Sequence, residues 1–121
     1  MNTTLLSGAA LLVASVIALS ACSMREQPVA GASGEEIYRV SACSTCHGDA
    51  LEGTSIGPPL GGLSTVWKRT DLVEFLGEPE LFLGQVERLI QLDSSFSATM
   101  PEYSNLSIEE RDRLVGFLLG E

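Results

Sequence analysis

Five consecutive residues carry the clearest chemistry in the sequence: Cys43-Ser44-Thr45-Cys46-His47. Two cysteines three positions apart lie on one side of a helical turn, where their thiols can form thioether bonds to the two vinyl groups of a haem. His47 follows directly and is then held beneath the ring, where an imidazole nitrogen can bind the iron. The pattern therefore predicts one covalently attached haem c, bound through Cys43 and Cys46, with His47 as an axial ligand.

Three other kinds of site could use the same residues. A zinc site needs a fourth ligand beyond Cys43, Cys46 and His47, but the chain has no second histidine and only one further cysteine, Cys22. A thioredoxin-like redox pair follows a strand, whereas residues 35–42 predict a helix. A disulfide between Cys43 and Cys46 would leave His47 without a role. Haem attachment accounts for more of this stretch than any of these alternatives.

Length and charge limit the class of protein and its partners. The chain has 121 residues, of which 7 are basic and 16 acidic, and its formal net charge is −9. This length suits one small domain. The basic residues are scattered along the chain, which argues against nucleic acid as a partner. An acidic surface favours encounter with a basic patch on another protein, although solubility alone would also explain it.

Residues 1–21 predict a lipoprotein signal peptide rather than part of the fold. The apolar, uncharged run ends in Leu19-Ser20-Ala21-Cys22, which resembles the bacterial lipobox. This resemblance implies cleavage before Cys22, a lipid on Cys22 and a location at the periplasmic face of a bacterial membrane. Ser23, rather than an aspartate, slightly favours the outer membrane. Because the first four residues include no Lys or Arg, an uncleaved N-terminal transmembrane anchor is the alternative.

A tether and a helical domain follow the signal. Residues 22–33 show no apolar periodicity and predict a flexible, lipid-anchored tether, and residues 34–121 form the predicted domain. No stretch alternates with the period of a strand, so the fold class is predicted to be all-α. Helices are predicted over residues 35–42, with Ser33 or Gly34 as the cap, and over residues 71–76, with Thr70 as the N-cap. A third helix, over residues 79–92, begins with Pro79 and has an apolar stripe of Phe82, Val86, Leu89 and Ile90. The last helix covers residues 108–119 and follows a capping box of Ser107 and Glu110.

Met100-Pro101 is a second candidate for iron chemistry. A residue before proline is held out of the helical region, so Met100 projects from a stiffened point next to the predicted loop 93–99. A thioether held in this way suits the sixth position on haem iron, although a methionine that fills a gap in the core is the alternative. Trp67 is most simply a core residue, but its N–H and the nearby Arg69 could reach the haem propionates.

These features together resemble the class I cytochrome c family over residues 34–121. The resemblance rests on Tyr38 in a short helix before the C-x-x-C-H motif, on Gly57-Pro58 after it, and on Met100-Pro101 before the last helix. It implies a small helical domain wrapped around one covalently bound haem c.

The resemblance also implies roles for individual residues. The Pro58 carbonyl would accept a hydrogen bond from the ring of His47, and Leu60 would pack against the haem. Met100 would be the second axial ligand of the iron. The first and last helices would cross, with Gly116 against Gly34 or Tyr38.

The predicted function is electron transfer rather than catalysis. A membrane-tethered carrier with one haem would pass single electrons between respiratory or periplasmic redox proteins, with no small-molecule substrate, because His47 and Met100 fill both axial positions. One alternative is a fixed haem c subunit of a membrane oxidase or dehydrogenase complex. Another, from a different class, is a gas-binding or sensing haem domain in which the Met100 ligand is labile.

Overall fold

The computed structural model describes residue 28 and residues 30–121, so the predicted signal peptide and Cys22 lie outside the described residues. In this part of the chain there are helices and loops but no strand, which confirms the predicted all-α class. No helix in the same part is both long and apolar enough to cross a membrane. The helical segments are α1 (Gly34–Val40), α2 (Ser44–His47), the 3-10 helix η1 (Leu63–Thr65), α3 (Arg69–Gly77), α4 (Glu80–Leu83), α5 (Glu87–Ser95) and α6 (Ile108–Leu119).

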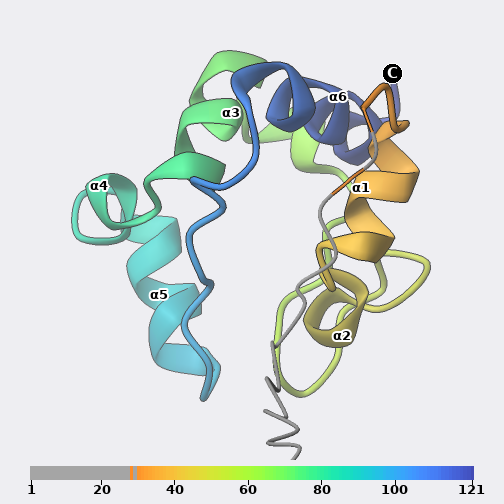
Figure 1. Ribbon diagram of the computed structural model, residues 1–121. Helices are drawn as coiled ribbons and strands as arrows, with labels where there is room; N and C mark the ends of the chain where they lie inside the picture. The colour runs from red at the N-terminus through yellow and green to blue at the C-terminus, as the bar shows by residue number, and fades with distance from the viewer. Residues whose placement is uncertain (1–27, 29) are drawn as a thin grey trace, which may run out of the picture.

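Helix α6 packs against both α1 and α3, and these three helices hold the domain together. Figure 1 shows α3 and α6 side by side, with one arm of α1 and α2 and a second arm of α4 and α5 extending from them. Burial of a large apolar side chain contributes about 1.5–3 kcal/mol, so the packing between these helices dominates the stability of the domain. The residues buried most completely in this core are Ile37, Tyr38, Leu76, Leu106, Leu114 and Val115.

Helices α1 and α6 begin with the same local structure, a capping box. The Ser33 hydroxyl accepts the N–H of Glu36 at 3.2 Å, and the Glu36 carboxylate accepts the N–H of Ser33 at 2.8 Å. Ser107 and Glu110 repeat the arrangement at 3.1 and 2.7 Å, as predicted. Each box satisfies two backbone N–H groups that a helix end would otherwise leave without partners. The cap of α1 is therefore Ser33 and not Gly34.

The predicted crossing of the first and last helices is present, but the glycine that permits it is Gly34 rather than Gly116. A Cβ atom added to Gly34 would lie 2.7 Å from the Cβ of Phe117 and would also collide with the carbonyl of Arg113. A Cβ on Gly116 would instead meet the guanidinium of Arg69 at 3.4 Å. The backbone of α1 therefore touches α6 directly at Gly34.

The start of α3 differs from the prediction. The helix begins at Arg69, and Lys68 occupies the N-cap position without a capping hydrogen bond from its side chain. The hydroxyl of Thr70 donates to the carboxylate of Asp71 at 3.1 Å instead of capping the helix. Thr70 as the N-cap is thus wrong, because the extended backbone that an N-cap requires occurs at Lys68, two residues earlier.

The single helix predicted over residues 79–92 is also wrong, since the chain forms α4 and α5 with a break between them. Gly84 has a low helix propensity, and Val86 is extended, with φ −104° and ψ 109°. The break changes which residues are buried: Leu89 is 6% exposed, whereas Val86 and Ile90 are 39% and 43% exposed. Helix α5 also continues to Ser95, into the predicted loop.

We predict that Gly34→Ala lowers the free energy of unfolding by roughly 1–3 kcal/mol, because the added methyl group overpacks the contact between α1 and α6. Gly84→Ala is the matched control. Its φ is −91°, no atom lies within 4 Å of an added Cβ, and the expected change is neutral or a gain of about 0.4–1 kcal/mol. Urea denaturation of the full-length protein measures both, and equal stabilities for the two variants would contradict the crossing.

Candidate functional site

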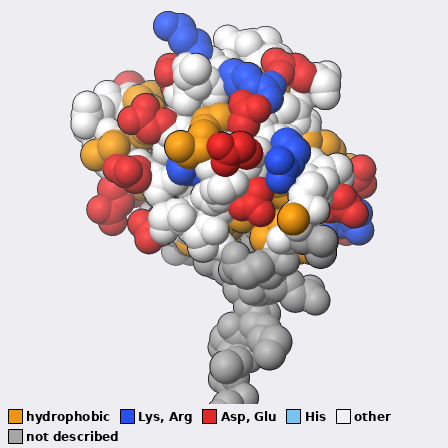
Figure 2. Space-filling view, turned by 45° about the horizontal axis from the view of Figure 1, so that its top comes forward, with side chains coloured by type: hydrophobic (Ala, Val, Ile, Leu, Met, Phe, Trp, Pro, Cys, Tyr) orange, Lys and Arg blue, Asp and Glu red, His pale blue; other side chains and the backbone are white. Residues whose placement is uncertain are grey.

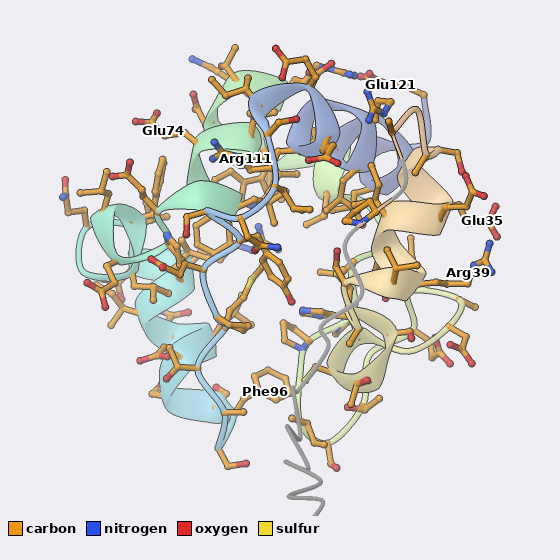
Figure 3. All side chains as sticks on the ribbon, viewed as in Figure 1. Glu35, Arg39, Glu74, Phe96, Arg111 and Glu121 are labelled. Atoms are coloured by element: carbon orange, nitrogen blue, oxygen red, sulfur yellow. The ribbon has the colours of Figure 1, made fainter. Side chains whose placement is uncertain are left out.

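A cavity of about 420 Å³ lies between the two arms of the domain. Its lining is mostly apolar and comes from both arms and from α3 and α6 (Figure 1). Figure 3 shows Phe96, which follows α5, extending toward the opposite arm. The structure brings seven of the predicted haem-site residues to this cavity: Cys43, Cys46, His47, Pro58, Leu60, Trp67 and Met100.

Cys43 ends the short turn that joins α1 to α2, and Cys46 lies within α2. Ala42, just before them, has a left-handed backbone with φ 58°, so the chain changes direction between the two helices. Cys43 is 8% exposed and occupies the N-cap of α2, while Cys46 lies one turn later. The thiols are not joined in a disulfide. Both are therefore present as thiols on the cavity wall, as thioether formation requires.

The ring of His47 is held by the predicted hydrogen bond. Its Nδ1 lies 2.8 Å from the carbonyl oxygen of Pro58. A carbonyl can only accept, so Nδ1 carries the hydrogen and Nε2 keeps a free lone pair. This is the tautomer that a metal-binding histidine needs, and the hydrogen bond also fixes the orientation of the ring.

The loop after α2 is folded tightly beneath the motif, and its hydrogen bonds explain the position of Pro58. The Thr54 hydroxyl donates to the carbonyl of Cys46 at 2.7 Å, and the Thr54 N–H donates to the carbonyl of Gly57 at 2.9 Å. A Cβ on Gly57 would lie 2.9 Å from the Cys46 carbonyl, so a larger residue there would push the loop away. The sequence analysis did not identify Thr54, because no local pattern marks its bond to Cys46.

Tyr38 fixes the other end of the motif. The side chain is 1% exposed, and its hydroxyl donates to the carbonyl of Gly48 at 2.7 Å. Burial disfavours the phenolate and raises the pKa of Tyr38 to about 12. The ring packs 5.5 Å from that of Phe117. Tyr38 is therefore a core aromatic at the crossing of α1 and α6 that also supports the residue after His47.

Met100 lies on the opposite wall, in the segment between α5 and α6. This segment is anchored by Tyr103, whose N–H donates to the Leu76 carbonyl at 2.8 Å. The Tyr103 hydroxyl reaches across to the carbonyl of Ser41 at 3.5 Å, and the side chain is 5% exposed. Tyr103 thus ties the Met100 segment both to α3 and to the end of α1. The sequence analysis did not identify Tyr103. The only sign of its role was its position three residues after Met100.

Trp67 and Leu60 have the surroundings expected of cavity-lining residues. Both are half-buried and pack against the core. The ring of Trp67 lies 5.0 Å from that of Phe75 and 5.9 Å from that of Phe82, so it is a core residue and a lining residue at once. These aromatic contacts fix the wall that joins α3 to α4.

Arg69, a predicted haem-environment residue, does not line the cavity and instead binds two carboxylates. Its Nε and Nη2 donate to the two carboxylate oxygens of Asp112 at 2.8 and 2.9 Å, and Nη1 forms an ion pair with Glu121. These bonds lower the pKa of Asp112 below its ordinary range. No local pattern in the sequence indicates these contacts, because the partners of Arg69 lie on and just after α6, more than 40 residues further along the chain.

Among the described residues, no group of three or more His, Cys, Asp or Glu side chains is arranged to hold a metal ion by itself. The zinc alternative therefore finds no support here. A c-type haem fits the lining better. Its attachment needs two thiols, its iron needs donors such as an imidazole and a thioether, and its ring needs apolar walls. Cys43, Cys46, His47 and Met100 supply these groups in one cavity, although their bonds to haem stay predictions.

An all-helical domain with a C-x-x-C-H turn and a Met-Pro loop on one apolar cavity is a c-type cytochrome domain. The chain belongs to the family described as cytochrome c oxidase, cbb3-type, subunit III, whose model matches residues 29–118. No curated protein and no solved structure gave a significant match. Membership implies covalently bound haem c and a role in electron transfer.

We predict that Tyr38→Phe lowers the free energy of unfolding by about 1–3 kcal/mol, because the buried Gly48 carbonyl loses its donor. Since the pKa of Tyr38 is raised to about 12 from an ordinary value of 10.0, its stabilising effect is complete below about pH 10 and declines toward about pH 12. The stability difference between wild type and Tyr38→Phe should therefore shrink over that range. Denaturant titrations at several pH values measure it.

Tyr103→Phe is the control for this experiment. It keeps the hydrogen bond from Tyr38 to Gly48, so a decline in stability between about pH 10 and pH 12 should remain in this variant. A difference between wild type and Tyr38→Phe that stays constant up to pH 12 would contradict the role assigned to Tyr38.

Proposed function

We propose that the protein is a membrane-tethered cytochrome with a single haem c, which passes single electrons between partner proteins. The observation that carries the proposal is the orientation of His47. Its Nδ1 is occupied by the Pro58 carbonyl at 2.8 Å, and its ring lines the same cavity as Cys43, Cys46 and Met100. Covalent attachment, imidazole ligation and thioether ligation can all occur in this one space.

Each of these residues has a distinct role in the proposal. Cys43 and Cys46 would hold the haem by thioether bonds, and His47 and Met100 would bind its iron. The bound haem supplies a one-electron couple between the ferric and ferrous states. Pairing histidine with methionine raises the reduction potential, and the apolar lining further disfavours the extra positive charge of the ferric state. With His47 and Met100 both bound, the iron would have no open position for a small-molecule substrate.

The surface supports partners of basic or apolar character. The net charge is −9, and Figure 2 shows carboxylate side chains spread over much of the face in view, with basic side chains between them. Such a surface accelerates encounter with basic proteins. Electron exchange needs brief contacts, so we expect interfaces of less than about 1,200 Å² that release quickly.

A fixed subunit of a membrane oxidase is the second candidate function. The observation that favours it is the match to a family described as subunit III of cbb3-type cytochrome c oxidase. The two candidates use the same haem chemistry and differ in the lifetime of the complex. A gas-binding or sensing domain is a weaker third candidate, because it requires Met100 to leave the iron.

We predict that Met100→Ala opens the sixth position on the iron. The reduction potential should fall because the thioether is lost, and the ferrous protein should bind carbon monoxide, which wild type should resist. Potentiometric titration and visible spectra of the haem-bearing protein measure both effects. Met24→Ala, which removes a thioether from the predicted tether, is the matched control and should behave as wild type. Unchanged spectra and potential in Met100→Ala would exclude Met100 as the ligand, and tight carbon monoxide binding by wild type would favour the sensing domain.

We predict that Cys22→Ala moves the protein from the membrane to the soluble fraction, because it removes the proposed site of lipid attachment. Fractionation of cells that express wild type or the variant tests this. Retention of Cys22→Ala in the membrane would instead support an uncleaved N-terminal anchor.

Purification of wild type from native membranes in mild detergent distinguishes the two leading functions. A partner that co-purifies in constant ratio supports the oxidase subunit, and a protein free of partners supports the carrier.

A further inference from the structure

Two arginines near the start of α6 bind backbone carbonyls on different neighbouring segments. Arg111 donates through Nη1 to the carbonyl of Val73 in α3 at 3.1 Å. Arg113 donates through Nε to the carbonyl of Ala32, just before α1, at 2.8 Å. Both side chains are half-buried. The two arginines therefore make the same kind of bond, but they attach α6 to different parts of the domain.

The guanidinium of Arg111 lies against the last turn of α3. A Cβ atom added to the buried Gly77 would lie 2.7 Å from the Cζ atom of Arg111, so the guanidinium occupies the space that a side chain at Gly77 would need. Figure 3 shows Arg111 between α6 and α3. The last carbonyls of a helix carry partial negative charge, which favours a cation at this end. Arg111 thus holds the C-terminal end of α3.

This contact has a cost that makes it more than simple packing. The Nε atom of Arg111 is buried and has no hydrogen-bond partner in the described part of the chain. A buried donor without a partner destabilises a fold. The contacts of the guanidinium with Val73 and Gly77 must offset that loss. Because these contacts lie on the backbone of α3, they restrain the position of its last turn directly.

The same turn of α3 anchors the segment that carries Met100. Leu76 precedes Gly77, and its carbonyl accepts the N–H of Tyr103 at 2.8 Å. Tyr103 follows Met100 by three residues and is 5% exposed. Pro101 stiffens the backbone between them. A displacement of the Leu76 carbonyl would therefore be passed on to the side chain of Met100.

We propose that Arg111 is a positioning residue for Met100, which it holds in place for the iron through the last turn of α3 and Tyr103. The inference rests on the proposed function, since it requires Met100 to bind the haem iron. The sulfur can leave the iron only if the Met100 segment moves. An anchor of that segment therefore slows the loss of the ligand, whereas the bond of Arg113 on the α1 side has no such effect.

Imidazole measures this effect, because it binds the ferric iron only after Met100 has left. The experiment mixes imidazole with the full-length, haem-bearing ferric protein and follows the loss of the Met–iron charge-transfer band. At high imidazole concentration the rate is that of Met100 dissociation. In Arg111→Ala this rate should rise by roughly 3- to 30-fold, as the loss of part of one charge-assisted hydrogen bond predicts.

Arg113→Ala is the matched control. It loses an equivalent bond to a backbone carbonyl and should lower the urea midpoint about as much as Arg111→Ala does, but its imidazole rate should remain that of wild type. Arg111→Lys keeps a charged donor of similar length and should recover most of the wild-type rate. A purely structural role would change stability in both alanine variants without separating their rates.

Gly77→Ala tests the same contact from the side of α3. The added methyl group would displace the guanidinium, so imidazole should also bind faster to this variant. In the double variant with Arg111→Ala, the methyl group meets no guanidinium, and its effect on the rate should disappear. If Arg111→Ala does not mature with haem, the rates of Gly77→Ala and Arg111→Lys against wild type decide the question.

Amide hydrogen exchange gives a measurement that does not depend on the iron ligand. The N–H of Tyr103 should exchange faster in Arg111→Ala and at the wild-type rate in Arg113→Ala. Equal imidazole rates for these two variants, or an unchanged rate in Gly77→Ala, would overturn this inference alone if wild type shows the charge-transfer band. Haem-bearing wild type without that band would exclude Met100 as the ligand and would overturn the proposed function together with the inference.

Discussion

The hydrogen bond between the His47 ring and the Pro58 carbonyl is the constraint around which the haem site is arranged. It decides which imidazole nitrogen faces the cavity, and it can form only if the loop after α2 returns beneath the motif. The bonds from Thr54 to Cys46 and Gly57 hold that loop in place. A proline at position 58 stiffens the backbone that presents the carbonyl. Several weak, short-range contacts thus fix the direction in which His47 presents its second nitrogen to the cavity.

The remainder of the domain places the second wall of the cavity opposite this one. The crossing of α1 and α6 at Gly34 and the packing of α6 on α3 set the distance between the two arms. Tyr103 then joins the Met100 segment to α3 through Leu76 and to the end of α1 through Ser41. Because these contacts are remote from the motif in sequence, the fold and the iron site depend on each other. The helices position the ligands, and a bound haem would fill the space that the arms leave between them.

The residues by themselves predicted local features, such as the C-x-x-C-H turn and the capping box at Ser107. The bond of His47 to Pro58 and the crossing of the first and last helices were predicted only through the family resemblance. The break at Gly84 could not be deduced from apolar spacing, because Val86 and Ile90 fit the stripe of a continuous helix and are nevertheless exposed. The ion pairs of Arg69 could not be deduced either, because Asp112 and Glu121 lie more than 40 residues further along the chain.

The lining of the cavity includes apolar side chains from both arms. Ile56, 39% exposed, lies on the side of the motif, and Phe96 extends from the α5 side (Figure 3). An electron tunnels through thin layers of hydrocarbon and needs only that donor and acceptor come near each other. Apolar side chains in this lining are therefore no obstacle to the passage of charge.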